Sequence, residues 1–229
     1  MPGPIALVGS GEFLPQMDEV DRFLLDGRPQ RVVHLPTAAG REGPGSLARW
    51  ARMARDHYGA MDVEVESLDV IDTVSANDPD LAERIPGAGL VYLSGGDPRY
   101  CADTLRGSLV WQAIADAWRS GTALAGCSAG ACTLSAVALS PRGGGPAPGL
   151  GPADHVAVIP HYDRARFLHP VFHRMMHSAM PDTAELIGVE EDTALVGEVG
   201  GEWTAMGRQH VVLIDQGKRR MAAGETVTF

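Results

Sequence analysis

The stretch TALAGCSAGACTLS, Thr122 to Ser135, begins as an apolar run and turns at two glycines on either side of a serine. The segment TALAG predicts a buried strand, and AGACTLSAVAL predicts the helix that follows it. Gly126, Ser128 and Gly130 form the pattern G-x-S-x-G, typical of a tight strand-to-helix turn that exposes a nucleophile. The alternative is a small-residue turn with a structural serine, because this pattern also arises by chance.

Four earlier apolar runs end in turns, and stretches with helical periodicity separate them. The runs are PIALVGSGE (4–12), RVVHLPTAAG (31–40), DVEVESL (62–68) and GLVYLSGGD (89–97). Strands that alternate with helices predict an α/β fold of three layers, with a mostly parallel sheet and helices on both faces. Ligands bind outside the carboxyl ends of such strands, so the loops GSGEF, LSGGDPRY and AGCSAGA are expected to converge on the site.

The second half of the chain differs in composition and in the spacing of its apolar residues. The Gly/Pro-rich stretch at 140–152 is expected to be a mobile surface loop without regular structure. Whether its residues 143–151 form a lid over the site is not decided by the sequence. A strand-like HVAVIPHYD (155–163) and a helical stretch (164–180) follow. Short strands with glycine turns then predict a small antiparallel extension near the C-terminus. Since no repeat or linker is apparent, residues 1–229 are expected to form a single domain.

Composition argues against several classes of protein. A formal net charge of −10 argues against binding to nucleic acid. The three cysteines include no CxxC pair, which argues against a disulfide framework or a zinc knuckle. No apolar run reaches the length of a membrane helix, and the N-terminus lacks the features of a signal peptide. We therefore expect a cytoplasmic protein with no membrane partner. GSGEF departs from the dinucleotide fingerprint at Leu14, so no cofactor is expected.

A nucleophilic serine needs a base, and histidine is the usual one. His161 ends the predicted strand HVAVIPHYD, so it is expected at the same sheet edge as Ser128, whereas His155 begins that strand. The alternative for His161 is a loop histidine bonded to the backbone. Three more histidines share one helical face by their i, i+4, i+8 spacing: His169, His173 and His177. No glutamate of a zinc protease motif accompanies them, so no metal site is expected.

Four segments, LSGGD, AGCSAGA, IPHYDRAR and GVEEDTALV, occur in an order and at separations that resemble one family. Together they are similar to the serine peptidase family of aspartyl dipeptidase (dipeptidase E) and cyanophycinase, which has a class I glutamine-amidotransferase-like fold. The resemblance spans residues 9–215. It implies that Ser128 is the nucleophile and His161 the base. Amidotransferases carry cysteine at the elbow centre, so release of ammonia from glutamine is disfavoured here, and Cys127 is expected to point into the core.

The resemblance also implies the remaining parts of a catalytic site. A glutamate downstream of the histidine completes the family's triad and corresponds to Glu191, with the adjacent Glu190 and Asp192 left as alternatives. Backbone N–H groups of Gly96 and Ala129 would form the oxyanion hole.

The family's substrates imply a small peptide with an acidic side chain, which an arginine would bind. The expected substrate contacts are Asp97, Arg164, Arg166 and Arg174, with Arg99 as a further candidate. The arginines could equally face solvent. The expected function is a dipeptidase that prefers an N-terminal aspartyl residue and works through an acyl-enzyme, as a monomer or homodimer. The alternatives are hydrolysis of β-aspartyl peptides or esters, and a non-catalytic amidotransferase-like binding domain.

Overall fold

The computed structural model describes residues 1–140, 143, 145–164 and 169–229. Within this described part of the chain, no helix is long and apolar enough to cross a membrane.

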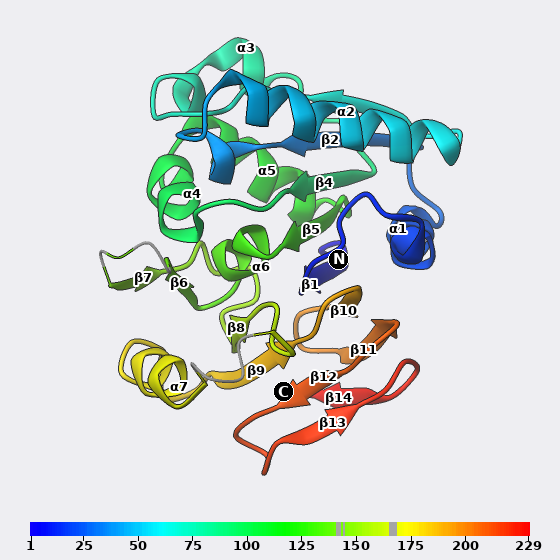
Figure 1. Cartoon of the computed structure of the whole chain (residues 1–229). Coiled ribbons are helices and arrows are strands. Elements are labelled where there is room, and N and C mark those ends of the chain that lie inside the picture. Colours follow the sequence, from blue (N-terminus) through cyan, green and yellow to red (C-terminus); the bar gives the residue numbers. More distant parts are fainter. Residues whose placement is uncertain (141–142, 144, 165–168) are drawn as a thin grey trace.

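Eight strands form the main sheet, in the order β14-β11-β10-β1-β5-β4-β2-β3 (Figure 1). Five of them are parallel to one another: β1 (Ile5–Val8), β2 (Arg31–Leu35), β3 (Glu64–Ser67), β4 (Leu90–Leu93) and β5 (Ala123–Cys127). Three C-terminal strands continue the sheet in antiparallel pairing: β10 (Thr193–Gly197), β11 (Glu202–Gly207) and β14 (Thr226–Thr228). The predicted mostly parallel sheet and its antiparallel extension are therefore confirmed.

Helices cover both faces of this sheet because successive strand residues point to opposite sides. In β1, Ala6 and Val8 share a buried cluster with residues of α1 (Asp18–Leu25) and α2 (Pro44–Ala60). Ile5 and Leu7 belong to a second cluster on the opposite face, which the following helices complete: α4 (Pro98–Leu105), α5 (Leu109–Arg119) and α6 (Ala129–Leu134). Four short elements complete the first part of the chain: η1 (Pro15–Met17), η2 (Thr37–Ala39), η3 (Ser75–Asn77) and α3 (Pro79–Ala82). The three predicted layers are thus present.

A second sheet lies beside the first, in the order β13-β12-β9-β8, and α7 (His169–His177) flanks it (Figure 1). Its strands are β8 (Val156–Ile159), β9 (Glu185–Val189), β12 (Val211–Leu213) and β13 (Arg219–Met221). The sequence assigned β9 to the antiparallel extension, and β9 does pair antiparallel with β12, but on its other side it pairs in parallel with β8. The carboxyl ends of β8 and β9 therefore meet at one edge, which is where the next residues of each strand enter the site.

A short hairpin connects α6 to the second sheet. It pairs β6 (Val137–Leu139) with β7 (Pro146–Pro148) in antiparallel register. The expectation of no regular structure at 140–152 is therefore wrong for residues 146–148. Proline is tolerated there because a two-stranded ribbon has only edge strands, where a missing N–H does not break a continuous ladder. Residues 141–142 and 144 lie outside the described residues, so the suggested lid at 143–151 stays a prediction.

Candidate active site

Ser128 occupies a sharp turn between β5 and α6. Its φ and ψ are 51° and −104°, a conformation that a non-glycine residue rarely adopts. The flanking glycines make the turn possible, since a Cβ on Gly126 would collide with the backbone of Gly130, and one on Gly130 with the carbonyl of Leu93. The small residues around Ser128 are therefore a steric requirement of the same turn that presents its hydroxyl.

His161 reaches Ser128 from the second sheet. It follows the carboxyl end of β8 by two residues, and its Nε2 lies 2.9 Å from Ser128 Oγ. The other ring nitrogen, Nδ1, lies 3.2 Å from Glu191 Oε1. Glu191 follows β9 by two residues, so the parallel pairing of β8 and β9 is what sets the two side chains next to each other. The structure thus brings Ser128, His161 and Glu191 into one hydrogen-bonded line.

The carboxylate of Glu191 is held from several directions. Its Oε2 accepts a hydrogen bond of 2.9 Å from Arg164 Nε, and its backbone N–H donates to Asp163 Oδ1 at 3.0 Å. Thr193 Oγ1 and Gln209 Nε2 both donate to its carbonyl oxygen. The Arg164 guanidinium thus holds one oxygen of this carboxylate and leaves the other to face His161 Nδ1.

The two alternatives to Glu191 have other partners. Glu190 is buried, with its carboxylate within 3.2 Å of His210 Nδ1 and 2.9 Å of Arg220 Nη2. The Asp192 carboxylate lies 3.3 Å from Arg208. Glu191 is therefore the one acidic residue of the three whose carboxylate bonds His161 in the described structure.

Two backbone N–H groups are available beside the serine hydroxyl. Ala129 is the first residue of α6, and the N–H of a first helical residue has no acceptor within its helix. Gly96 lies in the loop after β4, has φ +148°, and a Cβ there would collide with the carbonyl of Ala38. Within the described part of the chain, no hydrogen bond from either N–H to a backbone carbonyl is seen. Both residues line the cavity at Ser128, as an oxyanion hole requires.

Glu12 is a part of the site that sequence reasoning missed. In the GSGEF loop after β1, its buried side chain accepts 3.0 Å from the Gly95 N–H and 2.8 Å from the Cys127 thiol. Burial, and the negative charge of Glu12, raise the pKa of Cys127 well above its ordinary value. Cys127 therefore points into the core, as expected, and Glu12 ties the double-glycine loop to the residue before the nucleophile.

A cavity of about 330 Å³ opens directly beside Ser128. Ser128, His161, Gly96 and Ala129 form one side of it. The remaining walls are almost entirely apolar: Pro98, Cys132, Leu139, Val158, Ile159, Pro160, Phe172 and Met176.

The expected substrate-binding residues that the structure describes do not line this cavity. Asp97 caps α4 by accepting from the Tyr100 N–H, and Ser140 Oγ donates to it at 2.9 Å. Asp97 and Arg99 face a neighbouring cavity of about 620 Å³. Arg164 is 73% exposed at its side chain and bonds Glu191, and Arg174 is exposed on α7. Arg166 lies outside the described residues.

Two of the three helical histidines, His173 and His177, have protein partners. The His173 ring stacks on Tyr162 with 6.0 Å between ring centroids, and His177 Nε2 lies 3.2 Å from Asp215. Among the described residues, no group of three or more His, Cys, Asp and Glu side chains is arranged to hold a metal ion.

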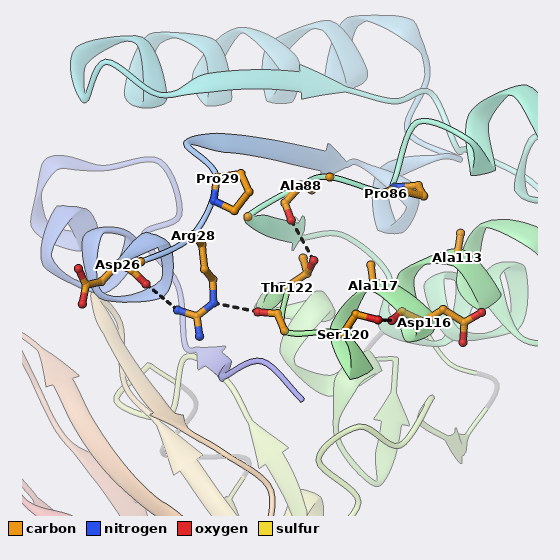
Figure 2. A pocket seen from close by; sticks show the side chains of 14 residues that line it. Asp26, Arg28, Pro29, Pro86, Ala88, Ala113, Asp116, Ala117, Ser120 and Thr122 are labelled. Carbon is orange, nitrogen blue, oxygen red and sulfur yellow. Dashed lines mark hydrogen bonds between the residues drawn. The ribbon is translucent and has the colours of Figure 1, made fainter. Parts of the chain in front are cut away.

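A larger cavity, of about 860 Å³, lies at the opposite edge of the main sheet (Figure 2). Its walls include the residues that precede β2, β4 and β5, which places it at the amino ends of those strands. The polar groups drawn there bond to each other: Arg28 Nε donates to the Gly121 carbonyl, and Thr122 Oγ1 to the Ala88 carbonyl. These hydrogen bonds connect neighbouring loops at the amino ends of the strands. Ser128, His161 and Glu191 lie at the opposite edge, where the strands have their carboxyl ends.

Comparison with known proteins identifies the family of this chain. The model of peptidase family S51 matches residues 5–202. Cyanophycinases of Synechococcus elongatus and Trichormus variabilis are 28% and 26% identical over 195 and 199 residues, which cover 80% and 82% of this chain. The chain spans 58% and 65% of the length of those two relatives.

Two solved structures are similar over nearly the whole chain. A peptidase from an acI-B1 actinobacterium has a TM-score of 0.91 and 34% identity, with coverage of 100% of this chain and 98% of that one. A structure from Listeria monocytogenes EGD-e has a TM-score of 0.65 and 16% identity, with coverage of 91% and 100%, and supports the fold alone. The family model covers most of the chain, and the expected resemblance is confirmed: the chain belongs to peptidase family S51, a family of serine-type peptidases.

Proposed function

We propose that this protein hydrolyses small peptides through a Ser128–His161–Glu191 triad and an acyl-enzyme intermediate. The observation that carries the proposal is the unbroken line of contacts from Ser128 Oγ through both ring nitrogens of His161 to Glu191 Oε1. A nucleophile, a base and an orienting carboxylate in this arrangement are the common geometry of serine hydrolases on unrelated folds.

The proposed reaction begins when Ser128 Oγ attacks the substrate carbonyl and His161 Nε2 takes the hydroxyl proton. Glu191 accepts the Nδ1–H of His161 and so stabilises the imidazolium that forms. The negative charge on the carbonyl oxygen is met by the N–H groups of Gly96 and Ala129. His161 then gives its proton to the leaving amine, and water hydrolyses the acyl-enzyme by the same route in reverse.

The aspartyl preference is the less supported part of the expectation. It needs a cation at the acyl-binding cavity, and Arg99, Arg164 and Arg174 do not line that cavity. The preference is therefore kept only as the alternative that the resemblance implies. The same is true of β-aspartyl peptides, although the matched relatives are named cyanophycinases.

Substitution of the triad tests the mechanism. Ser128→Ala and His161→Ala are each expected to lower kcat by about 10³-fold or more with folding intact, because the residues act as one unit. Glu191→Gln is expected to lower kcat strongly, since a neutral amide cannot stabilise the imidazolium.

Glu190→Gln and Asp192→Asn are the matched controls for Glu191→Gln, because they remove neighbouring charges that do not contact His161. Hydrolysis of a dipeptide panel and circular dichroism would be measured for all five variants. Wild-type activity in the Glu191→Gln or His161→Ala variant would contradict the proposed roles. A protein that binds peptides without any serine-dependent hydrolysis would support the non-catalytic alternative.

A further inference from the structure

We infer that the cavity beside Ser128 binds an uncharged, apolar side chain on the acyl side of the scissile bond, so that the enzyme prefers residues such as leucine over aspartate there. This inference rests on the proposed role of Ser128 as the nucleophile. It concerns the class of substrate, which neither family membership nor the triad determines.

The cavity begins at the reacting atoms. Its lining includes Ser128 and His161 together with Gly96 and Ala129, whose N–H groups are the proposed oxyanion donors. A substrate whose carbonyl carbon lies against Ser128 Oγ therefore has this cavity as its nearest recess. Its volume of about 330 Å³ is at the small end for ligand sites, which suits a single side chain rather than a long peptide.

The geometry around His161 assigns the cavity to the acyl side. The acyl group stays bonded to Ser128 after the first step, whereas the leaving amine takes its proton from His161 and must depart. The His161 side chain is 41% exposed, so the path past it leads to solvent. The cavity beside Gly96 and Ala129 is left for the part of the substrate that stays.

Several separate elements supply the apolar walls of the recess. Leu139 comes from β6, Ile159 from β8, and Phe172 and Met176 from α7. Cys132 of α6 is also neutral, because burial raises the pKa of its thiol to about 12. Among the described residues, no lysine, arginine, aspartate or glutamate borders the cavity. A carboxylate placed against these apolar walls would lose its hydration without gaining an arginine or lysine partner among the described residues.

Two arginines close in sequence to the cavity residues, Arg164 and Arg174, are described, and both face elsewhere. Arg174 is exposed on α7, two residues from both Phe172 and Met176, which puts it on nearly the opposite side of the helix. Arg164 is engaged with Glu191 and Asp163. Helix α7 thus places Phe172 and Met176 in the cavity wall and directs Arg174 away from the cavity.

Protection of Ser128 from a small alkyl fluorophosphonate tests the inference without requiring turnover. The competitors are aminoboronic acids with the side chains of alanine, leucine and aspartate, which mimic the tetrahedral intermediate and differ only on the acyl side. Each buried methylene is expected to improve protection about fourfold. The leucine analogue should therefore protect at least tenfold better than alanine, and at least a hundredfold better than aspartate at pH 7.

Phe172→Arg tests the charge argument, with Val171→Arg as its matched control. Phe172 lines the cavity, whereas the adjacent Val171 is 60% exposed. Phe172→Arg is expected to shift the ratio of protection by the aspartate and leucine analogues at least tenfold toward aspartate, and Val171→Arg to leave that ratio unchanged.

The outcomes separate the two proposals. Equal or better protection by the aspartate analogue in the wild type overturns the specificity inference and leaves the nucleophile in place. The same shift in both arginine variants also overturns it, because the effect would then come from general charge. Failure of the fluorophosphonate to label Ser128 overturns the proposed function and, with it, this inference.

Discussion

Backbone strain at single residues accompanies the proposed chemistry. Ser128 and His161 have φ values of 51° and 50°, and Asp192, directly after Glu191, has φ 52°. Each such conformation costs on the order of 1–3 kcal/mol and persists only where the surrounding structure holds it. Ser128 N–H is fixed to the Val8 carbonyl, and Tyr162 N–H, next to His161, to the Val189 carbonyl. These bonds to neighbouring strands hold the reactive side chains at the turn.

Glu12 is expected to act as a positioning residue for the oxyanion hole. Glu12→Ala removes the acceptor of the Gly95 N–H, so the Gly96 peptide beside it should lose its orientation. We predict a fall in kcat of about 10- to 100-fold with a smaller change in KM, because the lost interaction serves the transition state. Steady-state kinetics on the peptide panel would measure the split.

Glu12→Gln is the control for this prediction, since its amide oxygen can still accept from Gly95. It is expected to retain most of the activity of the wild type. Equal loss in both variants, or a rise in KM alone, would show that the loop does not depend on this hydrogen bond.

Residues differ in how far their role could be predicted from the sequence. Ser128 could be found because its whole requirement, small flanking residues between a strand and a helix, is local. His161 followed from the end of one predicted strand. Glu12 could not be recognised, because its partners, Gly95 and Cys127, are 83 and 115 residues away in the chain. An acidic side chain within a glycine loop at the carboxyl end of a buried strand was the only signal for it.

His34 joins three neighbouring strands at the level of the elements. On β2, its Nδ1 lies 2.9 Å from Ser67 Oγ of β3 and its Nε2 lies 2.9 Å from Ser94 Oγ, just after β4. Complete burial lowers the pKa of His34 from 6.5 to about 3. The unfolded chain therefore binds a proton below pH 6.5 that the folded protein excludes.

We predict that this linkage costs stability as the pH falls. The contribution of His34 is fully present above pH 6.5 and is lost progressively between pH 6.5 and pH 3, by about 2 kcal/mol from pH 7 to pH 5. Urea unfolding at the two pH values would measure it. His34→Gln should be less stable than the wild type at pH 7 and should lose about 2 kcal/mol less on this pH step. An unchanged pH dependence in the variant would contradict the assignment.

The pairing of the strands could be predicted only in part from the sequence. Periodicity predicted the five parallel strands and the helices between them. It did not distinguish β9, the parallel partner of β8, from the antiparallel strands that follow, because the residue pattern of a short apolar strand does not indicate its direction in the sheet. The position of Glu191 beside His161 depends on that pairing. The sequence alone therefore does not decide which of Glu190, Glu191 and Asp192 contacts the histidine.

The two sheets share one buried core at the scale of the whole molecule. Ile5 of the main sheet and Val156, Ile187 and Met221 of the second sheet belong to the same hydrophobic cluster. We therefore propose a single domain and predict one cooperative transition in scanning calorimetry. Separate transitions for the two sheets would contradict it.

The active-site cavity is also a property of the whole molecule. Its walls combine residues from β6, β8, α6 and α7, and their joint apolar character appears only when these elements are assembled. The sequence of the helical stretch suggests a role for its arginines and histidines. In the structure, Phe172 and Met176 are the described α7 residues that line the cavity. The direction of a helix face depends on its packing, which composition does not specify.

The site depends on both sheets, because Ser128 comes from the first and His161 and Glu191 from the second. The most direct measurement of this account is identification, by mass spectrometry, of the residue that a fluorophosphonate labels in the intact protein. We predict a single adduct at Ser128 that forms at least 100-fold more slowly in the His161→Ala variant, because its base is gone. Labelling at another residue, or at Ser128 with an unchanged rate in that variant, would contradict the proposed triad.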